Sequence, residues 1–238
     1  MALLPLYIPR STRPKIVIIG GGYAGIAALI TLHRYSPDVE ITLIDPGSDH
    51  LKITHLHETF RYPLSDFLVP YASLEQRFGC RHIRSALAVD ESMLCQWQRD
   101  RCLQAGNQQV PFDYLLVASG ARSSPRPRGE AGEHVMAAVE NVFRLEDFFT
   151  ASGADLLDRF LTKGSAARNA ASSCISIVGG GATGIQFLFE LAGYLRRRRI
   201  NHGLQLVDDN ERILQQYPVG FSRYVEMRML ELDLEFYP

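Results

Sequence analysis

Three glycines and an aspartate near the start of this chain stand at spacings that suit a phosphate-containing ligand. The stretch KIVIIGGGYAGIAALITL (15–32) carries Gly20, Gly22 and Gly25 in the pattern GxGxxG, and Asp45 follows about twenty residues later. The first glycine of such a pattern permits a tight turn, the second lets the backbone approach a pyrophosphate, and the third lets a helix pack closely on a strand. The helix start then offers N–H groups to the phosphates, and the acid reaches a ribose hydroxyl.

The same arrangement occurs a second time. In CISIVGGGATGIQFLFEL (174–191) the glycines are Gly179, Gly181 and Gly184, and Asp208 is the corresponding acid. A lone GxGxxG is weak evidence, but each copy here has an apolar strand before it, a helix after it and an acid at the expected distance. The alternative that both acids are solvated strand ends stays open. Two units predict two dinucleotides, for which a flavin and a nicotinamide dinucleotide are the natural pair.

The elements that must position these residues follow one plan twice: a strand, a helix that begins at the glycines, and a parallel strand that ends on the acid. We therefore predict an α/β fold with two Rossmann-like three-layer βαβ domains, the second incomplete because the chain ends as its third strand begins. We also expect a hairpin over 93–103 that turns at Arg99 and Asp100. The predicted strands are 15–19, 39–45, a buried strand in 112–122, 176–178, 204–209 and 234–238, and the predicted helices are 24–33, 67–78, 143–160, 182–198 and 224–232.

Composition excludes several classes of function. The 238 residues are 46% apolar and 21% charged with a net charge of -1, which gives no general attraction to nucleic acid or to an anionic membrane. No apolar run approaches the length of a membrane span, and the start MALLPLYIP lacks the basic head of a signal peptide. The cysteines match no metal spacing and favour free thiols in a reducing compartment, and His55 and His57 lack partner ligands, so we expect no metal.

The order of these motifs resembles the two-dinucleotide-binding-domain flavoproteins, the pyridine nucleotide–disulfide oxidoreductase superfamily. The resemblance runs from Lys15 to the end of the chain and is carried by GGGYAG, Asp45, FDYLLVASGAR, ENVFRLEDF, VGGGATGIQFLFEL and LQLVDDNERIL. Within the superfamily the chain is most similar to the type II NADH dehydrogenases, on the stretches GATGIQFLFEL and HLKITHLHETF.

This resemblance implies an FAD-binding domain over 1–125 and an NADH-binding domain over 126–238. An acid at Asp208 favours NADH, because it would meet the 2′-phosphate of NADPH. Arg212 and the run 196–199 argue for NADPH, although cations are also favoured at a helix C-terminus for their own sake. The implied FAD residues are Gly20, Gly22, Tyr23, Ala24, Gly25, Asp45, Ala118, Ser119 and Gly120, and the implied NADH residues are Gly179, Gly181, Thr183, Gly184 and Asp208.

The implied activity is hydride transfer from NADH to the flavin, followed by electron transfer to an acceptor, a quinone in this interpretation. No catalytic side chain is assigned, because the cofactor supplies the reactivity. Gln186 stands where the type II dehydrogenases have a glutamate, whereas Glu190, one helical turn on, is retained. Two alternatives stay open: another flavoprotein of the superfamily, of the sulfide:quinone or ferredoxin reductase type, and a non-catalytic nucleotide-binding remnant. The chain lacks the Cys-x4-Cys pair of the disulfide reductases, so thiol chemistry of that type is not expected.

The ending at Pro238 also carries an expectation. The family continues beyond this point with the rest of the NADH domain and a return to the FAD domain. We therefore expect a C-terminally truncated chain with weak FAD binding and little NADH oxidation. We expect no nucleic-acid partner and a cytoplasmic protein, with peripheral contact to the inner face of a membrane as the alternative for a longer form; the oligomeric state is left open.

Overall fold

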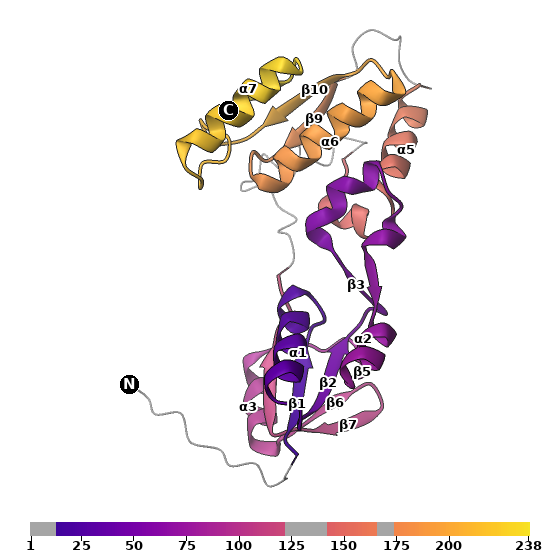
Figure 1. The fold of residues 1–238 in the computed structure, drawn as a ribbon, viewed down its shortest axis with the longest axis vertical. Helices are drawn as coiled ribbons and strands as arrows, with labels where there is room; N and C mark the ends of the chain where they lie inside the picture. Colours follow the sequence, from indigo (N-terminus) through magenta and orange to yellow (C-terminus); the bar gives the residue numbers. More distant parts are fainter. Residues whose placement is uncertain (1–12, 122–141, 166–173) are drawn as a thin grey trace. The chain divides into compact units, whose positions relative to one another are not determined.

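A computed structural model of the protein describes residues 13–121, 142–165 and 174–238 (Figure 1). This part of the chain forms two compact units. The first unit contains residues 13–52 and 68–121. The second unit contains residues 53–67, 142–165 and 174–238. The predicted domains, 1–125 for FAD and 126–238 for NADH, are defined by the ligand that each would bind. This division therefore stays a prediction.

The first unit is built on a parallel sheet whose strands, in spatial order, are β5 (Arg81–Arg84), β2 (Glu40–Asp45), β1 (Lys15–Ile19) and β8 (Tyr114–Val117). The β-branched side chains of β1 suit a central strand that is covered on both faces. Val17 and Ile18 point to opposite faces, and both are almost fully buried. Ile19 pairs with Ile44 at the ends of β1 and β2, so the glycine loop and Asp45 follow at the same edge of the sheet.

Two further layers cover this sheet, and their elements are α1 (Tyr23–Tyr35), α2 (Tyr71–Phe78), α3 (Glu91–Asp100), β6 (Cys102–Ala105) and β7 (Gln108–Pro111). Helices α1 and α2 cover one face, where Ile18 and Leu29 are fully buried. The helix α3 and the β6–β7 hairpin cover the other face, with Trp97 in its core. The α/β class is confirmed, and the predicted strands and helix over 15–45 lie within two residues of those observed.

The hairpin predicted at Arg99 and Asp100 is wrong. Those residues end the helix α3, and the hairpin is β6–β7, which turns at Gly106 with a φ of 58°. The missed signal was the helix start at Asp90, whose Oδ1 accepts a hydrogen bond of 2.8 Å from the Met93 N–H. Such an N-cap, together with the buried Trp97 on one helix face, outweighs the turn-like sequence at the helix end.

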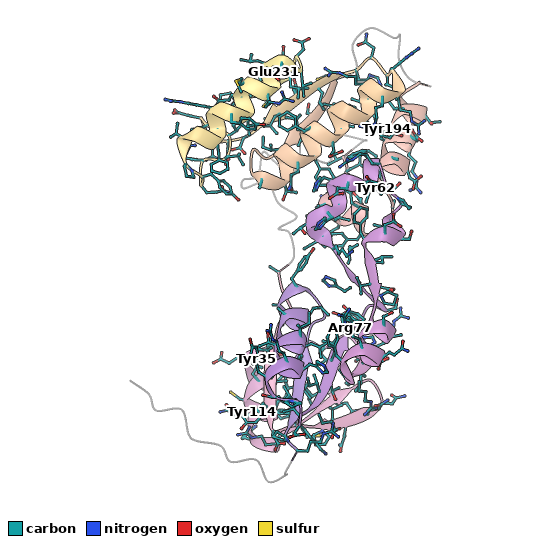
Figure 2. All side chains as sticks on the ribbon, in the orientation of Figure 1. Tyr35, Tyr62, Arg77, Tyr114, Tyr194 and Glu231 are labelled. Atoms are coloured by element: carbon teal, nitrogen blue, oxygen red, sulfur yellow. The ribbon has the colours of Figure 1, made fainter. Side chains whose placement is uncertain are left out.

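The prediction that 112–122 contains a buried strand is only partly right. The strand β8 exists, but Tyr114, which Figure 2 labels, and Leu116 are exposed. Their exposed fractions are 44% and 40%. Their exposure follows from the position of β8 at an edge of the described sheet, where β1 is its only described neighbour. The predicted helix over 67–78 is also shorter than expected, because β4 (Leu68–Pro70) precedes α2 and pairs with β3 (Asp49–Leu51).

The second unit repeats the plan of the first. Its sheet is parallel, and the order of its strands is β11 (Glu235–Tyr237), β10 (Gly203–Val207) and β9 (Cys174–Val178). The fully buried side chains Leu188, Leu206 and Ile213 form the centre of its core. The elements predicted over 174–238 are all present. The helix α6 (Ala182–Arg198) has the predicted bounds, and the ends of the three strands and of the helix α7 (Val219–Glu231) are shifted from those predicted.

Among its described residues, this unit has four further helical segments: the 3₁₀ segments η1 (Ile53–Phe60), η2 (Leu64–Phe67) and η3 (Leu145–Phe149), and the helix α5 (Gly153–Ser165). The single helix predicted over 143–160 is therefore wrong. It is interrupted because the Ser152 hydroxyl accepts a hydrogen bond from the Asp155 N–H and starts a new helix. Phe60 of η1 packs against the ring of Tyr194, which Figure 2 labels on α6. Within the described ranges, no helix has the length and apolar character needed to cross a membrane.

Candidate dinucleotide-binding sites

The three glycines of the first motif differ in whether the fold itself requires a glycine. Gly20 has a φ of +101°, and a Cβ there would lie 2.3 Å from the carbonyl oxygen of Ala118. A Cβ on Gly25 would lie 1.9 Å from the carbonyl oxygen of Gly20, because α1 packs directly on the turn. Gly22 differs from both, since a Cβ there would meet open space and its φ of -71° suits any residue. Only Gly22 is therefore free of a packing requirement.

The second motif repeats these roles. Gly179 has a φ of +113°, and a Cβ on Gly184 would lie 1.9 Å from the carbonyl oxygen of Gly179. Gly181, like Gly22, has open space beside it and an ordinary φ of -78°. Glycine at two unhindered positions is what a ligand that must approach the backbone requires.

Both helices begin in a way that leaves their ends open to an anion. The helix α1 starts after Gly22 and α6 after Gly181, each without a hydrogen bond from a capping side chain and without an acidic residue in its first turn. The first N–H groups of a helix lack partners within the helix, and the dipole adds partial positive charge there. The open space at the two glycines therefore adjoins a set of anion-binding donors.

The two acids are held by their own glycine loops. Oδ2 of Asp45 accepts a hydrogen bond of 2.7 Å from the Gly21 N–H, and its Oδ1 accepts one of 2.8 Å from the Gly47 N–H. Oδ2 of Asp208 accepts from the Gly180 N–H in the same way. Both acids are therefore engaged by their loops, and the choice between a ribose contact and a structural strand end stays open. Each carboxylate keeps further lone pairs, so a contact to a ribose stays a prediction.

Hydrogen bonding also sets the ionisation of Asp208. Burial opposes its ionisation, but hydrogen bonds from the backbone of Gly180 and from Asn210 outweigh burial and hold the pKa of the Asp208 carboxyl below its usual value. A lowered pKa in the folded state stabilises the fold above the unfolded-state pKa of about 4, and this stabilisation is lost as the pH falls through the folded-state value.

We therefore expect Asp208→Asn to lower the free energy of unfolding at neutral pH, with a difference from the parent that shrinks as the pH falls below about 4. Urea unfolding of both proteins, monitored at several pH values and by a probe in the second unit, measures this difference. A difference that does not change with pH would show that the Asp208 charge contributes nothing to the loop.

The remaining predicted site residues lie at or near these loops. The Ala118 N–H donates to the Ile19 carbonyl over 2.7 Å, which brings Ala118 beside the Gly20 turn. Gly120, two residues on, has a φ of +72°. Exposed residues at the predicted sites are Tyr23 and Ala24 in the first turn of α1, Ser119 and Gly120 after β8, and Thr183 in the first turn of α6.

The sequence did not indicate Tyr71, and it included His50 only as the first residue of the stretch HLKITHLHETF. Both contact the first glycine loop at the Gly21 carbonyl oxygen. Burial, together with the charge of Asp45, raises the pKa of the Tyr71 phenol, which therefore stays protonated and able to donate. No spacing rule would have found this contact, because Tyr71 follows a strand pair that has no marked pattern.

The arguments for NADPH lose their support in the structure. Arg196–Arg199 stand at the C-terminal end of α6, a helix of 17 residues, and so lie about 25 Å from its N-terminal glycine loop. The guanidinium of Arg212 donates to the Ser222 hydroxyl and to the carbonyl oxygens of Gln215 and Tyr217. These bonds tie Arg212 to its own loop.

Acid–base chemistry in the second unit is restricted. Gln186 is exposed on α6 and cannot exchange a proton. Glu190 accepts a hydrogen bond of 2.8 Å in an ion pair with Arg61, which directly follows η1. Burial lowers the pKa of the nearby His57, in spite of the charge of Glu58. Within the described ranges, no group of three residues is placed to hold a metal ion, and His57 instead lies beside a phenylalanine ring of α6.

Comparison with known proteins identifies the family. Residues 14–238 match the model of the family described as pyridine nucleotide-disulphide oxidoreductase. The chain belongs to this family. Among curated proteins, it is 27% identical over 206 residues to the type II NADH:quinone oxidoreductase of Staphylococcus aureus and 25% identical over 186 residues to that of Staphylococcus saprophyticus. These matches cover 84% and 75% of this chain but only 47% and 43% of the relatives, so the chain spans less than half of their length.

Solved structures of the family share the fold. The sulfide:quinone oxidoreductase from Aquifex aeolicus superposes with a TM-score of 0.68 at 20% identity, covering 94% of this chain and 50% of that one. NDH2 from Plasmodium falciparum, solved in complex with NADH, superposes with a TM-score of 0.66 at 16% identity, covering 94% and 48%. At these identities the likeness speaks for the α/β dinucleotide-binding fold alone.

Proposed function

We propose that this protein is a flavin-dependent NADH oxidoreductase that binds FAD in its first unit and NADH in its second. The observation that carries the proposal is the repeated arrangement of an unhindered glycine, an uncapped helix start and a loop-bound acid. Gly22 and Asp45 supply it in the first unit, and Gly181 and Asp208 supply it in the second. Family membership and the type II NADH:quinone oxidoreductase relatives support the assignment of FAD and NADH to this pair of sites.

The residues present fit the proposed ligands. A pyrophosphate needs backbone donors that it can approach closely, and the open positions Gly22 and Gly181 lie at the N-terminal N–H groups of α1 and α6, which no capping side chain covers. Asp208 favours a free ribose over a 2′-phosphate, because a carboxylate repels a phosphate. FAD supplies the hydride-accepting chemistry when it is bound. The protein's share is to bind and orient, which is consistent with Gln186 being unable to act as an acid or base.

A quinone is the electron acceptor in this proposal, supported by the names of the curated relatives. A cytoplasmic location, with peripheral contact to the inner face of a membrane as the alternative for a longer form, stays a prediction. A non-catalytic nucleotide-binding protein is the second candidate. It is favoured by Gln186 at the position of the expected glutamate and by the ion pair that Glu190 forms with Arg61.

The test is anaerobic flavin reduction. Little steady-state NADH oxidation is expected of this chain, so the test follows a single reduction. We expect the FAD-loaded chain to lose its visible flavin absorbance when NADH is added, and more slowly when NADPH is added. A water-soluble quinone should then restore the absorbance. Flavin that stays oxidised under NADH, in a chain that binds both ligands, would favour the non-catalytic candidate, and faster reduction by NADPH would contradict the assignment of the second ligand.

A further inference from the structure

We propose that His50 and Tyr71 are positioning residues that hold the Gly21 peptide of the first glycine loop and thereby set its affinity for FAD. The inference rests on the proposed function for the identity of the ligand. It concerns the peptide between the turn at Gly20 and the helix start at Gly22. That peptide directly precedes Gly22, beside which a pyrophosphate would approach the backbone.

Both backbone polar groups of Gly21, its N–H and its carbonyl oxygen, are hydrogen-bonded to side chains. Its N–H donates to Asp45 Oδ2 over 2.7 Å. Its carbonyl oxygen accepts two hydrogen bonds, from the Tyr71 hydroxyl at 3.0 Å and from His50 Nδ1 at 2.9 Å. A carbonyl oxygen can only accept, so His50 carries a proton on Nδ1.

The side chains of Tyr71 and His50 are themselves held in place by burial and by neighbouring rings. Tyr71 and His50 are only 2% and 7% exposed. The ring of His82 packs on Tyr71 with centroids 4.5 Å apart, and the ring of Tyr23 meets His50 edge-on at 4.9 Å. A Cβ on Gly21 would lie 2.1 Å from the Tyr71 hydroxyl oxygen, so the tyrosine also explains why position 21 is glycine.

The second unit holds the equivalent peptide in a different way. The Gly180 N–H donates to Asp208, as Gly21 does to Asp45. The Gly180 carbonyl oxygen, however, accepts a 2.8 Å hydrogen bond from the backbone N–H of Leu214. The carbonyl is thus held by side chains in the first loop and by backbone in the second. Substitution of His50 and Tyr71 should therefore loosen the first loop alone.

A loop that is already ordered loses less conformational entropy when it binds a ligand, so its affinity is higher. We expect Tyr71→Phe and His50→Leu each to raise the Kd for FAD about tenfold. His50→Asn should restore most of the affinity, because its side-chain amide can donate from a position near that of Nδ1. The Kd for NADH should not change in any of these variants.

The experiment combines FAD and NADH titrations with hydrogen exchange of the Gly21 amide in the ligand-free protein. In the double variant Tyr71→Phe/His50→Leu we expect weaker FAD binding, unchanged NADH binding and faster exchange at Gly21. Parent-like FAD affinity in a folded double variant would overturn the inference. If the parent itself binds no flavin, the proposed function fails, and exchange alone decides: unchanged protection of Gly21 overturns the positioning role, and faster exchange supports it.

Discussion

Gly22→Val is expected to weaken FAD binding at least about 100-fold while the protein stays folded. The φ of -71° at Gly22 suits valine, and a Cβ there would meet no atom of the protein. The cost to folding should therefore be about 1 kcal/mol or less, the size of a poorer helix N-cap. The valine side chain would instead occupy the space beside the helix N–H groups through which a pyrophosphate reaches the backbone.

The matched control for Gly22→Val is Gly181→Val in the second loop, where the φ of -78° and the open space are the same. This variant should lose NADH binding and keep FAD binding, and Gly22→Val should do the reverse. Flavin fluorescence and calorimetric titration with NADH measure the two affinities. Undiminished FAD binding by Gly22→Val would mean that the ligand does not approach through this loop.

Gly25→Ala is expected to act in the opposite way, by damaging the fold itself. The new Cβ would lie 1.9 Å from the Gly20 carbonyl oxygen, which belongs to backbone that cannot turn aside. Separation of α1 from the turn should cost about 3 kcal/mol, the upper end for overpacking. The equivalent change Gly184→Ala has the same 1.9 Å conflict with Gly179 and should destabilise the second unit.

Gly220→Ala is the control for these alanine variants, because Gly220 lies in α7 and a Cβ there meets open space. It should leave stability unchanged or raise it by about 0.5–1 kcal/mol through helix propensity. Thermal unfolding of the three variants measures the difference. Gly25→Ala with the thermal stability of the parent would show that α1 and the turn are not as closely packed as the structure has them.

The repeated units were predictable because local signals and tertiary packing agree there. The run 15–19 is apolar and β-branched, and the structure buries it in the sheet where the pattern requires. The α6 boundaries at Ala182 and Arg198 also follow directly from the glycine start and the basic end. Local sequence failed over 91–103, where an N-cap at Asp90 competes with a turn-like helix end.

The glycines and acids of the candidate site were predictable because each has a local reason in the chain. The contacts of Tyr71 and His50 were not, since they depend on how the β3–β4 pair brings residues from two segments to one carbonyl oxygen. The engagement of both acids with loop N–H groups was also unforeseen. Spacing identifies an acid that can reach a ribose, but it does not say which donors hold the carboxylate before a ligand arrives.

The central claim is that the two loops are separate sites for two different dinucleotides. Its most direct test is calorimetric titration of the chain with NADH, first alone and then in the presence of saturating FAD. Separate sites predict one NADH and one FAD bound per chain, with an NADH affinity that FAD does not compete away. Competition between FAD and NADH, or a total of one nucleotide per chain, would contradict the account.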